Sequence, residues 1–339
     1  MIHHTDEELL AAELKIDNPL QQSGLVWALP DGAKFKAIRN LYAYSAWPND
    51  KVPCAMCGFP NHKFGFTVEF ESGELMLMGS SCGAKIAGET WQQQENAMRD
   101  LGNRQYYLRL LERAKAADEK LVRAIWALER RFDQISRLHV RFRKQLPEAY
   151  ELLIQQCRKG EPVLEVKEMR ENEAAKYATA GQSVPKFVEN VLFRHRLQGT
   201  GFFFSEDPLL EFQSAMKDIE SLFAVARATA GKSTNALSLV CRKARAALEV
   251  LGKLVEGVNE TPKFFAPRNL EGVSQWLNHL GLRHDLYSIE GQSLCWNDGA
   301  DTVKIDFPPP YEDAIDHARL TRLSAALQLN ETRLVWGRD

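Results

Sequence analysis

The chain has 339 residues, which is enough for two or three domains with sizeable cores. Apolar residues make up 45% and charged residues 26%, as in ordinary soluble proteins, and the net charge of −2 excludes a global field that would attract nucleic acid or a membrane surface. Residues 1–10 are polar and acidic, unlike a signal peptide, and no apolar run approaches the roughly 18 residues of a membrane span. We therefore expect a cytoplasmic protein that makes no contact with membranes.

A cluster of potential metal ligands stands near the start of the chain. Cys54 and Cys57 are separated by two residues, and His62 and Cys82 follow. Two cysteines at this spacing form a tight turn that presents both sulfurs to one ion, and a histidine and a third cysteine complete a tetrahedron. The sequence therefore predicts one structural Zn²⁺ bound by Cys54, Cys57, His62 and Cys82.

Two other interpretations of this cluster stay open at this stage. The cysteines could be free thiols with His62 on the surface, or the zinc could be catalytic, with an open coordination position and Glu69 or Glu74 as general base. Four protein ligands favour a closed structural site. The remaining cysteines, Cys157, Cys241 and Cys295, are widely scattered, which indicates buried thiols rather than a disulfide framework.

Around these ligands, the pattern predicts two strands at 64–70 and 74–78, joined by a turn at Ser72 and Gly73, and a helix at 84–98. The order of knuckle, hairpin and cysteine at a helix start resembles the broad superfamily of treble-clef zinc modules over residues 50–92. The chain departs from that pattern because His62 precedes the hairpin, whereas a treble clef usually draws two ligands from the helix turn. Modules of this kind bind DNA, RNA or protein, or only hold a small fold together.

Two long stretches carry apolar residues at alternating spacings of four and three. Ten of twelve seam positions are apolar between Tyr107 and Leu146, and thirteen of fourteen between Phe212 and Val258. The seam keeps its register, which favours an antiparallel coiled-coil hairpin of helices about 60 Å long over a globular bundle with a 3.6-residue period. Asp118 and His139 are polar seam positions that would set the register. Self-association through the seams is a further expectation.

The outer face of the first predicted helix is basic. Thirteen Lys and Arg against six acidic residues between Arg99 and Lys144 give a local balance of +7. One interpretation is a solvated helix face with intrahelical ion pairs. The other is a surface that contacts phosphates, to which arginine is well suited. For the second interpretation, the predicted nucleic-acid-binding residues are Arg130, Arg131, Arg141, Arg143 and Lys144.

The remaining segments yield weaker predictions. Between the long helices, the pattern predicts a short strand at 163–166, a charged helix at 167–179 and a helix from 184. After residue 263 it predicts a helix at 269–280, strands at 283–289, 293–296 and 302–307, and a last helix at 312–329. Residues 226–233 match a relaxed phosphate-binding loop, but they continue a helical pattern, whereas such a loop needs a preceding strand.

The sequence thus predicts a mainly α protein with small β elements. We expect a zinc-binding domain at 1–92, a long helical hairpin at 93–262 with an insert at 147–205, and a small α+β domain at 263–339. The predicted function is non-enzymatic nucleic acid binding, in bacterial or phage DNA transactions. The alternative is a protein–protein adaptor with a partner at the end of the rod, and an enzyme is the third hypothesis.

Overall fold

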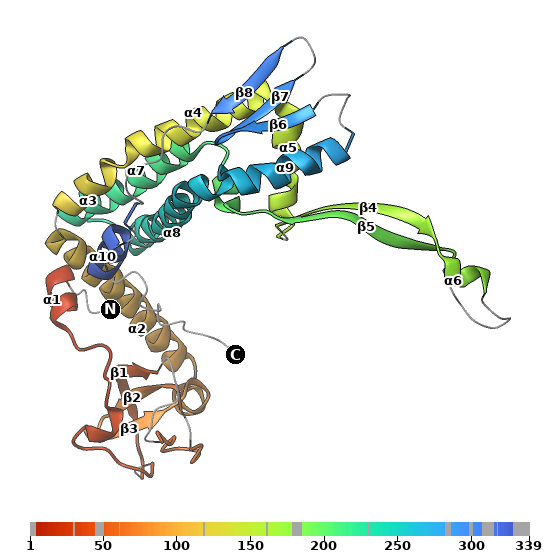
Figure 1. Ribbon diagram of the computed structural model, residues 1–339. Helices are drawn as coiled ribbons and strands as arrows, with labels where there is room; N and C mark the ends of the chain where they lie inside the picture. The colour runs from red at the N-terminus through yellow and green to blue at the C-terminus, as the bar shows by residue number, and fades with distance from the viewer. Residues whose placement is uncertain are drawn as a thin grey trace. The chain divides into compact units, whose positions relative to one another are not determined.

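The computed structural model describes residues 5–29, 31–44, 51–60, 62–117, 119–160, 162–177, 185–229, 231–281, 286–297, 301–306, 315–316 and 318–327 (Figure 1). The chain forms two compact units. Among the described residues, the first unit contains 5–117, 220–245 and 323–327, and the second contains 119–219, 246–306 and 315–322. The division at residues 92 and 262 stays a prediction. A mainly helical fold with small antiparallel sheets is confirmed.

The first unit is built on a three-stranded antiparallel sheet in the order β1-β2-β3. Its strands are β1 (Phe35–Ala43), β2 (Phe64–Phe70) and β3 (Leu75–Met78), and α2 (Ser80–Ala116) follows directly. The predicted strands at 64–70 and 74–78 are thus β2 and β3. Trp91 of α2 is fully buried, and its ring meets that of Phe66 edge-on with the centroids 5.4 Å apart.

A kink in α2 brings Trp91 back over the start of its own helix. Gly88 has φ 51° and ψ −127°, a backbone conformation that glycine adopts at little cost. The Trp91 ring lies so close to Gly83 that a Cβ at this position would overlap it. The buried carboxylate of Glu95 accepts hydrogen bonds from Ser80 Oγ and Trp91 Nε1, each 2.7 Å long. These contacts fix the first turn of α2.

Short elements and two further helices complete the first unit. Thr5 caps α1 (Asp6–Ala11) through a capping box, and Arg104 of α2 forms an ion pair with Asp6. A 3₁₀ turn, η1 (Pro19–Gln21), follows. The end of α7 (Pro208–Arg227) and the start of α8 (Thr234–Phe264) also belong to this unit. Ser238 of α8 donates a 2.9 Å hydrogen bond to Tyr107 Oη of α2.

The second unit is mainly helical. Besides parts of α7 and α8, it contains α3 (Glu119–Trp126), α4 (Glu129–Gln145), α5 (Pro147–Arg158), η2 (Thr200–Phe204), α9 (Pro267–His279) and the first part of α10 (Ala318–Leu327). Aromatic rings dominate its core. Phe132 stacks on Phe212 at 4.5 Å and Phe202 on Phe264 at 5.5 Å, and all four are buried.

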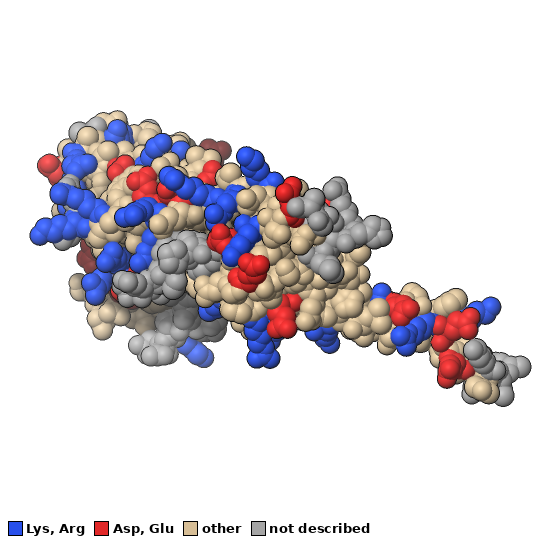
Figure 2. All heavy atoms as spheres, turned by 45° about the horizontal axis from the view of Figure 1, so that its top comes forward, with Lys and Arg blue, Asp and Glu red and all other residues tan. Residues whose placement is uncertain are grey.

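Two small antiparallel sheets belong to the second unit. One contains β6 (Leu286–Glu290), β7 (Ser293–Asn297) and β8 (Thr302–Asp306), close to the predicted strands. The other is a ribbon of β4 (Val163–Glu171) and β5 (Phe187–Arg196), with the short α6 (Glu173–Lys176) beyond β4. In Figure 1 this ribbon leaves the helices of its unit, and acidic and basic side chains are interspersed along it (Figure 2).

The ribbon corrects most of the helix predicted at 167–179, of which only Glu173–Lys176 is helical, and it corrects the helix predicted from 184. Residues 178–184 lie outside the described residues. Lys167–Glu171 continues β4, and the chain from Phe187 is β5. The physical reason is that both faces of the distal ribbon are exposed, so residues 167–171 of β4 are charged at four of five positions, and residues 187–191 of β5 mix apolar, polar and charged side chains without alternation. A strand of this kind lacks the apolar alternation that a half-buried strand shows.

The two predicted long helices are each interrupted. The run from 107 to 146 is divided among α2, α3 and α4: Ala117 ends α2 with extended backbone angles (φ −69°, ψ 141°), and α3 ends at Trp126 before α4 begins at Glu129. The run from 212 to 258 is divided between α7 and α8, with Gly231 at φ +73° in the connection. The prediction of helices is thus correct, whereas the prediction that each run is one unbroken helix is wrong. Asp118 lies outside the described residues.

His139 is a core residue of the second unit. Its side chain is completely buried, lies 2.8 Å from Tyr150 Oη through Nδ1, and stacks on Phe202 with the ring centroids 4.0 Å apart. Burial lowers the pKa of His139 from 6.5 to about 4. The imidazole is therefore neutral in the folded protein at neutral pH.

Every helix in the described part of the chain is too short or too polar to cross a lipid bilayer.

We predict that His139 makes the protein less stable in acid. Between pH 6.5 and about 4 the unfolded chain binds a proton at this residue that the folded chain does not, so the free energy of unfolding falls as the pH falls, by at most about 3 kcal/mol. Urea unfolding of the wild type and His139→Phe across this range measures the contribution. Equal pH dependence in the two proteins would contradict it.

Candidate metal centre and candidate nucleic-acid interface

Three cysteines come together in the first unit. The sulfurs of Cys54, Cys57 and Cys82 all lie within 4.8 Å of one another. The first two stand on a tight turn that is closed by a 2.9 Å hydrogen bond from Gly58 N to Cys54 O, with Gly58 at φ +70°. Ala55 N donates to Leu77 O at 2.8 Å, which fastens this turn to β3. Cys82 lies in the first turn of α2, which Trp91 and Glu95 hold in place.

The three thiols differ in their electrostatics. A backbone N–H of Phe59 aimed at the sulfur, followed by contacts with Cys82 and Cys54, lowers the pKa of the exposed Cys57 thiol. Burial, followed by the contacts with Cys57 and Cys54, raises the pKa of Cys82 to about 12. The surroundings thus favour the thiolate at Cys57 and disfavour it at Cys82. A bound cation would supply the positive charge that lets all three sulfurs ionise together.

His62 lies beside the cluster but outside the group of ligand atoms that approach within 4.8 Å. Its Nδ1 is 3.2 Å from Tyr42 Oη, and its ring stacks on Phe59. The opposite edge of the ring faces Gly79, where a Cβ would stand 3.5 Å from Cε1 and 3.7 Å from Nε2. Burial lowers the pKa of His62, which favours the neutral, ligand-competent imidazole.

Tyr42 is a residue of this site that the sequence analysis missed. It is fully buried on β1, and burial raises the pKa of its phenol, so the hydroxyl stays protonated. Its ring lies over its cross-strand partner Gly65, where any Cβ would overlap it. A glycine within the predicted strand at 64–70 is the signal that could have indicated such a close approach.

The two carboxylates considered as catalytic bases are engaged elsewhere. Glu69 accepts a 2.8 Å hydrogen bond from Lys36 and pairs with Arg39, and these two cations lower its pKa. Glu74 accepts a hydrogen bond from Ser72 in the turn between β2 and β3. The three cysteines can thus bind a metal, but neither Glu69 nor Glu74 is available beside them as a general base.

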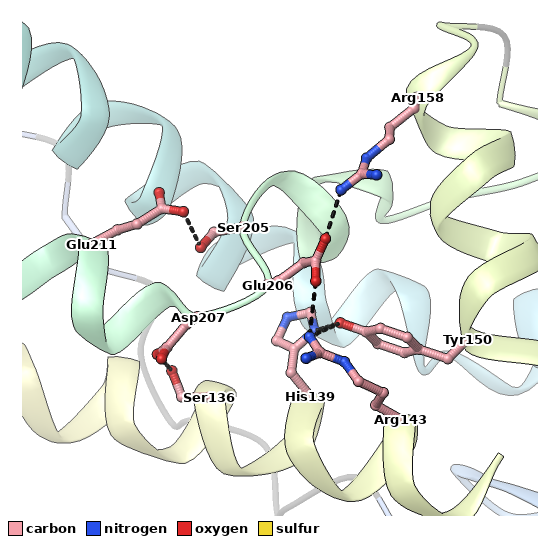
Figure 3. Close-up of polar contacts among 9 residues, drawn as sticks. All are labelled: Ser136, His139, Arg143, Tyr150, Arg158, Ser205, Glu206, Asp207 and Glu211. Atoms are coloured by element: carbon pink, nitrogen blue, oxygen red, sulfur yellow. Dashed lines mark hydrogen bonds and ion pairs between the residues drawn. The ribbon is translucent and has the colours of Figure 1, made fainter. Parts of the chain in front are cut away.

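The five predicted nucleic-acid-binding residues all lie on α4, but not on one face. Arg130, Arg141 and Lys144 are exposed, and Arg131 is half-buried. Arg141 donates a 2.6 Å hydrogen bond to Asp306 O of β8. Arg143 points elsewhere: it forms a 3.0 Å ion pair with Glu206, and its guanidinium lies 5.2 Å from the centre of the Tyr150 ring (Figure 3).

A surface hollow of about 520 Å³ lies along α4. It is lined by Ser136, Arg137, Val140, Arg141, Lys144, Gln145, Asp207 and Leu209. Arg137, which the sequence analysis did not select, belongs to the same helix face as Arg141 and Lys144 because their spacings are four and three. Arg130 is one further heptad towards the start of α4. Arg137 also pairs with Asp133 at 2.9 Å.

The one acid that lines the hollow already has partners. Asp207 Oδ1 accepts hydrogen bonds from Ser136 Oγ at 3.0 Å and from Leu210 N at 3.2 Å, so it caps the start of α7 (Figure 3). Ser136 Oγ in turn accepts a 2.9 Å hydrogen bond from Leu209 N. The Asp207 carboxylate is thus directed at the helix start rather than into the basic row.

The phosphate-loop match at 226–233 has no strand before it. Helix α7 runs through Arg227, and Thr229 Oγ1 donates back to the carbonyls of Val225 and Ala226. The segment is a connection between two helices. Its context does not provide the strand–loop–helix geometry that cradles phosphates.

Comparisons with known proteins identified no relative of this chain. No family model matches the chain, and neither a curated protein nor a solved structure does. The resemblance to treble-clef modules therefore depends on the residues of the chain alone.

Proposed function

We propose that this protein binds nucleic acid through α4 and that a structural zinc ion holds its N-terminal module together, without enzymatic activity. The observation that carries the binding proposal is the row of cations on one face of α4, Arg130, Arg137, Arg141 and Lys144, three of which line the hollow. Cytoplasmic localisation and a role in DNA transactions stay predictions.

The zinc proposal starts from the three clustered thiols. Three cysteine sulfurs and one histidine nitrogen make a closed tetrahedral Zn²⁺ site, and sulfur-rich sites select zinc over harder cations. Tyr42 contacts Nδ1 of His62, which leaves Nε2 for the metal and sets the orientation of the ring. Because Gly79 has no side chain, the ring has room to move towards Cys82 when the ion binds. We therefore assign His62 as the fourth ligand.

The nucleic acid proposal rests on the arrangement of charge on α4. The row from Arg130 to Lys144 is about 20 Å long at 1.5 Å per residue. Its opposite face is committed to the core through Phe132, Ile135 and Phe142. The row is therefore exposed to solvent, with Arg137 paired to Asp133 and Arg141 bonded to Asp306 O within the chain. Neutralising phosphates releases counterions, which would make binding strongly dependent on salt. The revised set replaces Arg131 and Arg143 by Arg137.

The zinc assignment predicts about one Zn²⁺ per purified chain, with the metal lost in Cys57→Ser. Elemental analysis of the gel-filtered protein measures the ratio. The matched control is Cys157→Ser, which removes a thiol of α5 and should leave the zinc content unchanged. His62→Ala should release zinc to a chelator faster than the wild type does. Equal zinc in Cys57→Ser and the wild type would show the assignment to be wrong.

The α4 assignment predicts that Arg137→Glu, Arg141→Glu and Lys144→Glu together abolish nucleic acid binding while the far-ultraviolet circular dichroism stays unchanged. Single charge-neutralising variants should each flatten the slope of log affinity against log salt by about one unit. The matched control changes three exposed cations outside α4, Arg242, Lys253 and Arg268, to Glu.

Fluorescence anisotropy with single-stranded DNA, double-stranded DNA and RNA at about 50 mM salt is the measurement. The affinity of the control triple variant should fall less than about threefold below that of the wild type, which is a loss of less than about 0.7 kcal/mol. A wild type that binds none of the three, or a control that loses binding as completely as the α4 variant, would reject the proposal and favour the adaptor hypothesis.

A further inference from the structure

We propose that the ribbon of β4 and β5 is a self-association surface, on which the same ribbon of a second copy of this chain docks face to face. This inference goes beyond the proposed function and does not depend on it. It starts from an unusual surface: Met169, Phe187 and Val191 are large apolar residues with 61%, 53% and 47% of their surface exposed. Exposed apolar residues that gather on one element mark interaction surfaces.

The base of the ribbon is held firmly, so the ribbon is presented in a defined direction within its unit. Leu164 is completely buried, and Trp276 Nε1 of α9 donates to Glu165 O at 3.4 Å. The His195 ring packs so closely on Gly272 that a Cβ there would overlap it, and His195 Nε2 lies 3.2 Å from Asn269 Oδ1. Pre-organisation of this kind reduces the entropy cost of docking.

One face of the distal ribbon carries three apolar and three charged residues, whereas the other carries one apolar residue among four. In the antiparallel register Lys167 lies opposite Val191, Met169 opposite Glu189, and Glu171 opposite Phe187. Alternate pairs of a ladder share a face, so Met169, Val191 and Phe187 lie together. The pairs of the other face are Glu168 with Asn190 and Arg170 with Val188, and Arg170 pairs with Glu168 at 3.0 Å.

The charges on the face of Met169 favour an identical partner. Consider a two-fold axis through the Met169–Glu189 pair, perpendicular to the strands. It places Lys167 of one copy over Glu171 of the other, twice, and Val191 over Phe187, twice. At the axis, Glu189 of one copy faces Glu189 of the other. Within each chain, Lys167 pairs with Glu189 at 2.9 Å and offsets this repulsion. An isologous contact of this kind closes as a dimer.

The mixture of signs on this face makes it a poor match for nucleic acid. Acidic and basic side chains are interspersed along the ribbon (Figure 2), so a phosphate backbone would meet repulsion as well as attraction. The face is small, because the five residues from Lys167 to Glu171 at about 3.3 Å each give a strand of about 17 Å. An interface of that size places the dimer at the weak end of specific association, with micromolar dissociation constants.

Sedimentation equilibrium of the full chain, from about 5 to 500 μM, tests the inference. The wild type should pass from monomer to dimer in this range. Val191→Asp, on the face of Met169, should raise the dissociation constant at least about tenfold, because it buries an unpaired carboxylate in the dimer. The matched control is Val188→Asp, the same change on the opposite face, where 39% of Val188 is exposed. It should change the dissociation constant less than about threefold.

A second measurement uses the symmetry. Met169→Cys lies on the proposed axis and should form an intermolecular disulfide under mild oxidation, whereas Arg170→Cys, on the other face, should not exceed the wild-type background. A wild type that stays monomeric up to about 500 μM would overturn the inference. Equal weakening by Val191→Asp and Val188→Asp, or equal crosslinking at 169 and 170, would also overturn it.

Discussion

The crowding of three cysteine sulfurs within 4.8 Å is the constraint on which the first unit depends. The turn of Cys54 and Cys57 is fastened to β3, and Cys82 is fixed by the packing of Trp91 on Gly83 and by the bonds to Glu95. The sheet and the kinked helix thus converge on the thiols from two directions. A divalent cation would join these parts into one structure, and its binding energy would become folding energy.

In the second unit, α4 and the ribbon of β4 and β5 each present two faces of different composition. Helix α4 directs Phe132, His139 and Phe142 into an aromatic core and leaves a row of cations outside. The ribbon of β4 and β5 instead exposes a face on which three apolar residues lie among three charged ones. A basic row suits an anionic polymer, and a face of apolar residues and mixed charge suits a protein surface. Nucleic acid binding and self-association would therefore use different elements.

The predictability of the fold followed the strength of the local pattern. The clustering of the cysteines and the strands β2 and β3 could be predicted because their sequence signals are short-range. Most of the helices could be predicted for the same reason. The break at Ala117 could not, because tertiary packing overrides an unslipped heptad pattern and alanine is otherwise the best helix former. At Gly231 the glycine itself was a local signal, since it weakens a helix and readily adopts positive φ. The ribbon was missed because strands exposed on both faces lack alternation. Tyr42 was missed because its contact with His62 joins distant segments, with Gly65 as the one local sign of its close approach, whereas the spacing of Arg137 from Arg141 and Lys144 did indicate a shared helix face.

The central claim, a closed zinc site that organises the first unit, is tested most directly by X-ray absorption spectroscopy of the purified protein at the zinc edge. The proposed ligands predict three sulfurs at about 2.3 Å and one nitrogen at about 2.0 Å, with the nitrogen shell lost in His62→Ala. A first shell of nitrogen and oxygen alone, or a spectrum unchanged in His62→Ala, would contradict the account.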